Sequence, residues 1–360
     1  MRKTKIVATL GPATESPDML ARLVAAGVDI FRLNMSHAKP EWVRHRVADI
    51  RQAAREAGRI VGILMDLQGP SIRTGDVPAP IPLAVGDRFC FCVRGATPPD
   101  GSKGTSVNYD LFARDVQVGA TLVVDNGDLK MRILAKTEDR VECEVLTEGS
   151  LGSRRHINLP GVRVSLPALT EKDRDHVALG LETAVDFIAL SFVREPADIG
   201  ALRACFDGVE SAPQIVAKIE HQFAVDHFEA IAHEADAVMV ARGDLGIECP
   251  FEELPIIQRR LVKTCHRIGR PVIVATEMLE SMIENPLPTR AEITDVAKAV
   301  FEQADAIMLS GETTVGRYPV ACVEVMDRIA RRIERSGGSN YQQDAELTQP
   351  RQKLVKSAVT

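Results

Sequence analysis

The stretch QIVAKIEHQFAVDHFEAIAHEADAVMVARGDLG (214–246) contains two short apolar runs, QIVAKIE and AVMVARG, and charged residues lie at or directly after the end of each. Near-continuous apolar runs, rather than strict alternation, are typical of strands buried on both faces of a parallel sheet. Six further runs of this kind occur, at 5–11, 30–34, 62–67, 186–192, 272–276 and 306–311. The chain therefore carries eight candidate strands of one parallel sheet.

Helix-like stretches lie between most of these runs, and several begin near Pro, Ser or Thr or end at Gly. They are predicted at 17–26, 41–58, 170–183, 256–269, 289–303 and 319–334. A strand followed by a helix, repeated eight times, is the pattern of a TIM (β/α)8 barrel. The sequence thus predicts an α/β fold of this type.

One segment, 70–165, interrupts the rhythm because it shows no convincing helical period. Its strand candidates are DRFCFCV (87–93), TLVVD (121–125), LKMRILA (129–135) and VECEVL (141–146), separated by Gly, Pro and Asp turn signals. We expect residues 70–165 to form an inserted small β-barrel lid domain over the carboxyl ends of the strands, where barrel active sites form. Residues 1–69 and 166–335 would form the TIM-barrel catalytic domain, and 336–360 a mostly disordered polar tail.

The composition excludes several classes of protein. The 360 residues are 45% hydrophobic and 26% charged, with 44 Lys and Arg against 50 Asp and Glu, which gives a net charge of −6. This acidic balance disfavours nucleic-acid binding, and no apolar run is long enough to span a membrane. The seven cysteines are scattered without a C-x-x-C pair, so we expect neither disulfides nor a zinc site. We expect the protein to be cytoplasmic.

Polar residues follow the predicted strands at their carboxyl ends. They are Arg32, Asn34 and Ser36 after the second run, Asp66 after the third, Lys218 and Glu220, Asp244, Thr276, and finally Ser310 and Glu312. Because side chains alternate along a strand, Lys218 and Glu220 point to the same side, as do Arg32 and Asn34. Each residue alone is more often a cap or a salt bridge, so the prediction depends on their convergence at one mouth of the barrel.

Glu220 and Asp244 are expected on adjacent strands, and both offer only oxygen ligands. This donor set suits a hard divalent cation such as Mg²⁺, with substrate and water completing the octahedron. Arg32, Arg73 and Lys218 supply the positive charge that a phosphoryl group with a neighbouring carboxylate requires. The sequence therefore predicts a site for a metal ion and a small anionic ligand.

Nine segments carry a resemblance to a known family. They are TKIVATLGP (4–12), FRLNMSH (31–37), MDLQGPSIRTG (65–75), HINLPG (156–161), DFIALSFVRE (186–195), AKIE (217–220), MVARGDLG (239–246), ATEMLESMI (275–283) and SGETTVGRYP (310–319). Together, and in this order, they resemble the pyruvate kinase family. The resemblance implies a TIM barrel with an inserted lid, and transfer of a phosphoryl group from phosphoenolpyruvate to ADP, giving pyruvate and ATP. It also implies Mg²⁺ or Mn²⁺ as a cofactor, and K⁺ in many members.

The resemblance assigns roles to residues of this chain. The implied catalytic residues are Lys218, Arg32, Arg73 and Thr276, and the implied substrate contacts are Arg32, Lys218, Gly243, Asp244 and Thr276. Nucleotide contacts fall on Asn34, Met35, Ser36, His37, Arg73 and Arg155. The Mg²⁺ ligands fall on Glu220 and Asp244, and the K⁺ ligands on Asn34, Ser36, Asp66 and the carbonyl of Leu67. Protonation of the enolate left after transfer would occur near Thr276.

Val315 replaces a lysine that is common in the family. Three further positions depart from the family pattern: Arg155 replaces the usual lysine, Glu277 replaces a usual Gln, and Ser71 stands where K⁺-dependent members carry Glu. These departures leave a second hypothesis open, a Mg²⁺-dependent lyase that adds the same pyruvate enolate to a carbonyl group. A third hypothesis is a binding protein without catalytic activity. The assay for ATP formation from phosphoenolpyruvate and ADP separates them.

The family's C-terminal regulatory domain is expected to have no counterpart in this chain. We therefore expect a barrel-to-barrel homodimer or a monomer rather than a tetramer. The expected partners are phosphoenolpyruvate or pyruvate and ADP or ATP, with no nucleic acid and no membrane.

Overall fold

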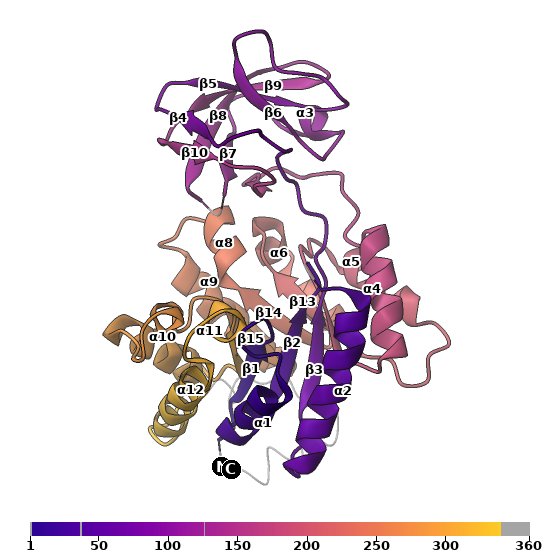
Figure 1. Cartoon of the computed structure of the whole chain (residues 1–360), viewed down its shortest axis with the longest axis vertical. Helices are drawn as coiled ribbons and strands as arrows, with labels where there is room; N and C mark the ends of the chain where they lie inside the picture. The colour runs from indigo at the N-terminus through magenta and orange to yellow at the C-terminus, as the bar shows by residue number, and fades with distance from the viewer. Residues whose placement is uncertain (1, 37, 126, 340–360) are drawn as a thin grey trace.

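The computed structural model describes residues 2–36, 38–125 and 127–339 (Figure 1). His37, predicted to contact nucleotide phosphate, lies outside the described residues. The same holds for residues 340–360 of the predicted polar tail.

Eight parallel strands close into a barrel in the order β1-β16-β15-β14-β13-β12-β3-β2. The strands are β1 (Lys5–Thr9), β2 (Ile30–Asn34), β3 (Gly62–Asp66), β12 (Phe187–Leu190), β13 (Gln214–Ile219), β14 (Ala237–Ala241), β15 (Val272–Ala275) and β16 (Ala306–Leu309). Each lies within one of the eight apolar runs. The predicted TIM barrel is confirmed.

The barrel strands are mainly apolar, apart from the polar residues near their ends, because both of their faces are buried. In β14, Ala237 and Met239 join a cluster inside the barrel that includes Val7 and Val216. Val238 and Val240 point the other way and pack in the larger core between the barrel and its helices. Alternating side chains thus fill two separate cores from one continuous apolar run, which explains the absence of polar alternation.

Six helices match the predicted stretches within a few residues: α1 (Pro17–Ala26), α2 (Pro40–Glu56), α4 (Glu171–Glu182), α9 (Leu254–Ile268), α10 (Arg290–Phe301) and α12 (Pro319–Glu334). Their ends follow local chemistry: α1 has a proline in its first turn and ends at Gly27, whose φ of 116° suits glycine. The sequence analysis did not predict the short helices α5 (Pro196–Arg203), α6 (Gln222–Asp226), α7 (Phe228–Glu234), α8 (Arg242–Glu248) and α11 (Gly311–Thr314).

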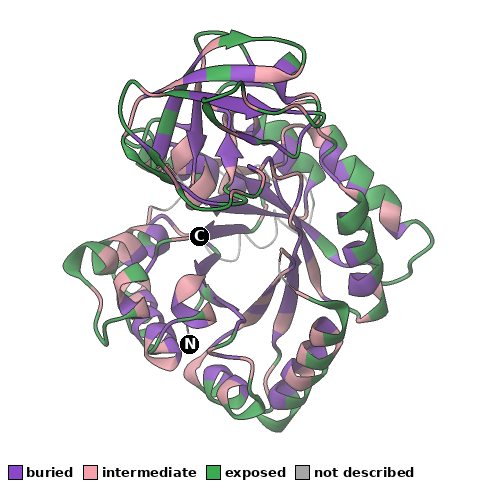
Figure 2. Cartoon of the chain, turned by 45° about the horizontal axis from the view of Figure 1, so that its top comes forward, coloured by how far each residue is buried: buried purple, intermediate pink, exposed green. Residues whose placement is uncertain are grey.

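The segment between β3 and α4 forms a separate β module above the barrel (Figure 1). Its elements are β4 (Ile81–Leu83), β5 (Arg88–Cys92), β6 (Lys103–Ser106), α3 (Phe112–Asp115), β7 (Thr121–Val124), β8 (Leu129–Lys136), β9 (Arg140–Val145), β10 (Gly149–Leu151) and β11 (Ile157–Asn158). Six strands form one sheet in the order β11-β7-β8-β9-β5-β6, and β10 pairs with β4. In Figure 2, the buried residues of the module lie in its interior and the exposed residues lie on its outer surface.

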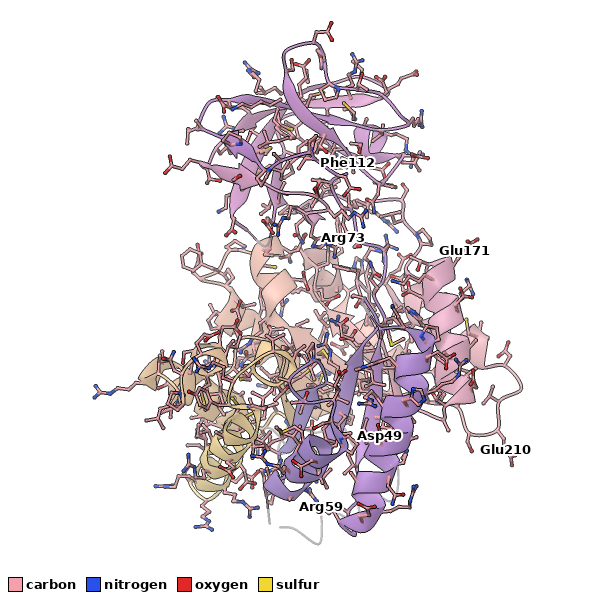
Figure 3. All side chains as sticks on the ribbon, in the orientation of Figure 1. Asp49, Arg59, Arg73, Phe112, Glu171 and Glu210 are labelled. Carbon is pink, nitrogen blue, oxygen red and sulfur yellow. The ribbon has the colours of Figure 1, made fainter. Side chains whose placement is uncertain are left out.

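The module has its own aromatic core. The ring centroids of Phe89 and Phe91 are 4.9 Å apart, and Phe91 meets Phe112 edge-on at 5.9 Å. Figure 3 places Phe112 within the module and Arg73 at its junction with the barrel. At the base of the module, the buried carboxylate of Asp173 accepts hydrogen bonds from the amides of Gly69 (3.2 Å) and Thr170 (3.0 Å). One side chain therefore ties together the two chain segments that connect the module to the barrel.

Within the described ranges, no helix combines the length and apolarity needed to cross a membrane.

The capping box of α10 gives a prediction for stability. The Thr289 hydroxyl accepts a hydrogen bond from the Glu292 amide (3.3 Å) and donates one to the Glu292 carboxylate (2.9 Å). Thr289→Ala should lower the free energy of unfolding by about 1 kcal/mol because the first turn loses its cap. Thr294→Ala, at an exposed site within the same helix, is the control and should change it by less than about 0.5 kcal/mol. Urea unfolding followed by circular dichroism measures both, and equal effects would contradict the capping role.

Candidate active site

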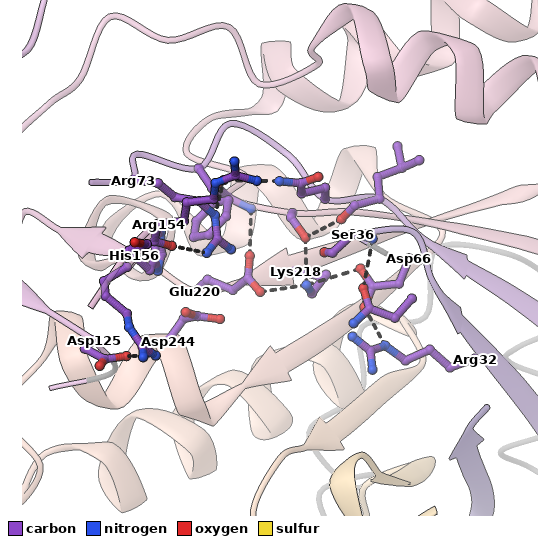
Figure 4. A pocket seen from close by; sticks show the side chains of 18 residues that line it. Arg32, Ser36, Asp66, Arg73, Asp125, Arg154, His156, Lys218, Glu220 and Asp244 are labelled. Carbon is purple, nitrogen blue, oxygen red and sulfur yellow. Dashed lines mark hydrogen bonds and ion pairs between the residues drawn. The ribbon is translucent and has the colours of Figure 1, made fainter. Parts of the chain in front are cut away.

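A polar cavity of about 390 Å³ lies at the carboxyl ends of the strands, between the barrel and the inserted module (Figure 4). The barrel contributes the lining residues Arg32, Asn34, Ser36, Asp66, Leu67, Gln68, Ser191, Phe192, Lys218, Glu220 and Asp244. The connecting segment and the module contribute Ser71, Arg73, Asp125, Ser153, Arg154, Arg155 and His156. The structure therefore brings most of the predicted site residues into one cavity.

The ammonium group of Lys218 lies at the centre of this cavity. Its Nζ is 2.8 Å from Glu220 Oε1, 3.2 Å from Asp66 Oδ1 and 2.7 Å from Ser191 Oγ. Burial opposes the charge, but Asp66 and Glu220 outweigh it and hold the pKa of Lys218 above its usual value. Lys218 is therefore a buried cation at neutral pH, with a fixed position.

The carboxylate of Asp66 forms ion pairs with two cationic side chains, Arg32 and Lys218. Its Oδ2 lies 2.6 Å from Arg32 Nε, and Arg32 Nη1 also donates to Thr9 Oγ1 at 3.1 Å. Burial alone would raise the pKa of Asp66, yet the charges of Lys218 and Arg32 keep it below the usual value. Asp66 is thus ionised and aligns Lys218 and Arg32 along one wall of the cavity.

Glu220 and Asp244 are the carboxylates that could hold a divalent cation. Glu220 follows β13, and its Oε2 accepts a hydrogen bond of 2.7 Å from the amide of Phe192, whose φ is 54°. Asp244 was expected at a strand end, but it lies in the first turn of α8, directly after the neighbouring strand β14. This placement still directs it into the same cavity.

The electrostatics of this pair favour a cation. Burial raises the pKa of both carboxyl groups, and the charge of Asp244 adds to the effect on Glu220. Among the described residues, no hydrogen bond or ion pair engages the Asp244 carboxylate. No cluster of three or more His, Cys, Asp or Glu side chains able to hold a metal occurs in the described part of the chain. Two carboxylates with substrate and water are an arrangement that Mg²⁺ accepts in proteins.

The module side of the cavity is basic. Arg73 donates to the carbonyl of Arg154 at 3.0 Å, and Arg155 pairs with Asp125 at 3.2 Å. Burial and the charge of Arg73 lower the pKa of His156 to about 4, so this ring is neutral at pH 7. The guanidinium group of Arg154 pairs with Asp76 at 2.8 Å. Guanidinium groups bind phosphate oxygens, so this side of the cavity suits an anion.

Some of the oxygen atoms predicted to hold a monovalent cation already accept hydrogen bonds within the protein. Asn34 Oδ1 accepts from the Ser36 amide at 3.1 Å, and the Leu67 carbonyl accepts from Ser191 Oγ at 2.8 Å. Lys172 Nζ lies 2.8 Å from Gln68 Oε1 and 3.4 Å from the Ser36 carbonyl. Positive charge therefore already lies beside these donors.

Other predicted residues lie beside the cavity rather than in its wall. Met35 is fully buried, and its amide donates to the Asp66 carbonyl at 3.0 Å. The Gly243 amide donates to Thr276 Oγ1 at 2.8 Å. Glu312, from the eighth strand end, is fully buried and accepts hydrogen bonds from the amides of Leu279 and Ser310. Its role in the structure is to hold loops.

Sequence reasoning missed several residues of the cavity, among them Ser191, Arg154 and His156. Ser191 could have been found, because it directly follows the apolar run of β12 as the predicted polar residues follow theirs. Arg154 and His156 lie just before β11, a strand of only two residues, so no periodicity marks the direction of their side chains.

Comparison with known proteins gives a consistent result. The family described as "Pyruvate kinase, barrel domain" matches residues 1–323. The pyruvate kinase of Bacillus licheniformis is 46% identical over 342 residues, and that of Sporosarcina psychrophila 44% over 339; both alignments cover 93% of this chain and 57% of the relative. The chloroplastic pyruvate kinase isozyme G of Nicotiana tabacum is 43% identical over 337 residues. The chain thus spans somewhat more than half the length of these relatives. With its barrel, its inserted module and its matched segments, the chain belongs to the pyruvate kinase family.

Proposed function

We propose that this protein transfers a phosphoryl group from phosphoenolpyruvate to ADP, giving pyruvate and ATP. The observation that supports this best is the buried Lys218 ammonium between Asp66 and Glu220, in the same cavity as the carboxylate of Asp244. Curated relatives named pyruvate kinase, 41–46% identical, add to it. We also propose that the protein is cytoplasmic and is a homodimer or a monomer.

Phosphoryl transfer needs positioning and charge neutralisation more than covalent help from the protein. Lys218 and Arg32 would bind the phosphoryl oxygens of phosphoenolpyruvate, and Lys218 would offset the charge that develops during transfer. Glu220 and Asp244 would hold Mg²⁺ or Mn²⁺, which supplies Lewis-acid stabilisation of substrate oxygens when bound. Gly243 and Thr276 would contact the substrate carboxylate, and the enolate carbon would receive its proton near Thr276.

The nucleotide would span two adjoining pockets that share Asn34. Arg73 and Arg155, with the Asn34–Ser36 turn, would hold its phosphates. A second, mainly apolar pocket of about 460 Å³ is lined by Leu10, Gly11, Pro12, Glu15, Asn34, Ala38, Lys39, Trp42 and Thr314. Its size and mainly apolar surface suit a nucleoside base. The indole of Trp42 is fixed by a 2.7 Å hydrogen bond to Glu15.

K⁺ is the second cation that the family resemblance implies, and we propose Asn34, Ser36, Asp66 and the Leu67 carbonyl as its donors. These donors are all oxygens, which fits K⁺. Both oxygens of Asp66 already face Arg32 and Lys218, and Lys172 lies beside the Ser36 carbonyl. We therefore propose a weak K⁺ requirement, measured by replacing KCl with NaCl at constant ionic strength.

We propose residues 70–165 as a lid and residues 1–69 and 166–335 as the catalytic barrel. The support is that the module contributes Arg154 and Arg155 to the cavity wall opposite Lys218. A lid that closes on bound phosphates would exclude water from the transfer.

The proposal is tested by incubating the protein with phosphoenolpyruvate, ADP and Mg²⁺ and following ATP. ATP formation that depends on the protein and on Mg²⁺ is the expected result. Absence of ATP together with aldehyde-dependent consumption of pyruvate would replace the proposal with the lyase hypothesis.

Lys218→Met removes the central ammonium group at similar side-chain length. Turnover should fall about 10³-fold or more, because the developing charge loses its stabilisation. Lys130→Met, at an exposed position of the module, is the control and should keep wild-type turnover. Circular dichroism confirms that each variant is folded. A folded Lys218→Met protein with near-normal turnover would show that Lys218 does not have this role.

Trp42→Ala tests the pocket proposed for the base. The KM for ADP should rise about tenfold, because stacking on an aromatic side chain contributes about 1–3 kcal/mol per base. The KM for phosphoenolpyruvate should stay unchanged, and Trp42→Phe should recover most of the loss. Equal changes in both KM values would place the nucleotide elsewhere.

A further inference from the structure

Arg242 is a buried guanidinium behind the active-site cavity. It directly follows β14, begins α8 and is 8% exposed. It does not line the cavity, and the sequence analysis assigned it no role.

The guanidinium binds the backbone at the end of the next strand, β15. Its Nε donates to the Ala275 carbonyl at 3.1 Å, and its Nη2 donates to the Thr276 carbonyl at 2.5 Å. On its other edge, Nη1 lies 2.7 Å from Asp295 Oδ1 of α10. Arg242 thus holds two consecutive carbonyls while Asp295 fixes its own orientation.

The backbone that it holds is strained. Thr276 has a φ of 68° and Glu277 a φ of 53°, a left-handed conformation in two consecutive residues other than glycine. For a β-branched residue such as threonine this is a genuine outlier, and it persists only where surrounding contacts impose it. Glu312 holds the far end of the same turn, where its carboxylate accepts the Leu279 amide at 2.9 Å.

This turn sets the direction of the Thr276 hydroxyl. Thr276 Oγ1 donates to the Ala275 carbonyl at 2.7 Å and accepts from the Gly243 amide at 2.8 Å. Arg242 binds the carbonyl of Ala275, and Gly243 directly follows Arg242 in the chain. Both hydrogen-bond partners of the hydroxyl are therefore positioned by Arg242.

We propose that Arg242 is a positioning residue for the proton-transfer step. It maintains the left-handed turn so that the Thr276 hydroxyl and the Gly243 amide keep the orientation that the substrate requires. This inference rests on the proposed function. A lysine at this position would keep the charge but could not donate to two carbonyls and Asp295 in the same planar geometry. Arg242→Lys should therefore fail to replace arginine.

The test is a double-mutant cycle of Arg242→Lys and Thr276→Ala. Two rates are measured: ATP formation, and exchange of the methyl hydrogens of pyruvate with D₂O, followed by NMR in the presence of Mg²⁺ and ATP. Each single variant should lower both rates tenfold or more, and the double variant should be no slower than the slower single variant. Losses that multiply would overturn the proposal, because Arg242 would then act independently of Thr276.

Arg259→Lys is the matched control. Arg259 also pairs with a carboxylate, that of Glu302 directly after α10, at 3.1 Å, and no hydrogen bond or ion pair among the described residues joins it to the turn. It should keep both rates near the wild-type values. A loss equal to that of Arg242→Lys would overturn the proposal by indicating a general effect on packing.

Amide hydrogen exchange separates this proposal from the proposed function. Exchange at Gly243 and across 276–279 should be faster in Arg242→Lys than in wild type and unchanged in Arg259→Lys. This measurement needs no activity, so a wild-type protein that formed no ATP would refute the proposed function while the exchange rates still tested the positioning. Unchanged exchange in Arg242→Lys would overturn the inference.

Discussion

The balance of charge around the Lys218 ammonium is the constraint on which the site depends. A buried ammonium group is costly unless carboxylates compensate it, and here Asp66 and Glu220 do so at 3.2 and 2.8 Å. With Arg32, this wall of the cavity holds two cations, while Asp244 brings the number of carboxylates to three. Among these five side chains of the barrel, one negative charge is in excess. The barrel mouth thus favours an added cation, and the basic module opposite it favours an anion.

Much of the fold could be predicted from the sequence, because burial on both faces leaves a clear apolar signature in all eight barrel strands. The polar residues that follow these strands could be predicted to converge, since a closed parallel barrel brings all carboxyl ends to one rim. The helices α5, α6 and α7 are short, so they span too few turns to show a period of 3.6 residues. Their absence from the prediction did not change the topology.

The remaining features of the site depend on contacts between residues far apart in the chain. That Ser191 links Lys218 to the Leu67 carbonyl follows from the adjacency of β3, β12 and β13, not from a local pattern. The left-handed turn at Thr276 contradicts the local preference of threonine and glutamate, so sequence alone would predict an extended or helical backbone there. Asp244 was placed correctly in space but on the wrong element, because α8 begins immediately after β14.

The central claim is that Glu220 and Asp244 together hold a divalent cation beside Lys218. Mn²⁺ binding, followed by electron paramagnetic resonance with and without phosphoenolpyruvate, tests it most directly in the wild type, Glu220→Gln and Asp244→Asn. The account predicts one Mn²⁺ per chain, displaced by Mg²⁺, and an affinity at least about tenfold weaker, or about 1.4 kcal/mol, in each variant. Unchanged affinity in both variants would contradict it.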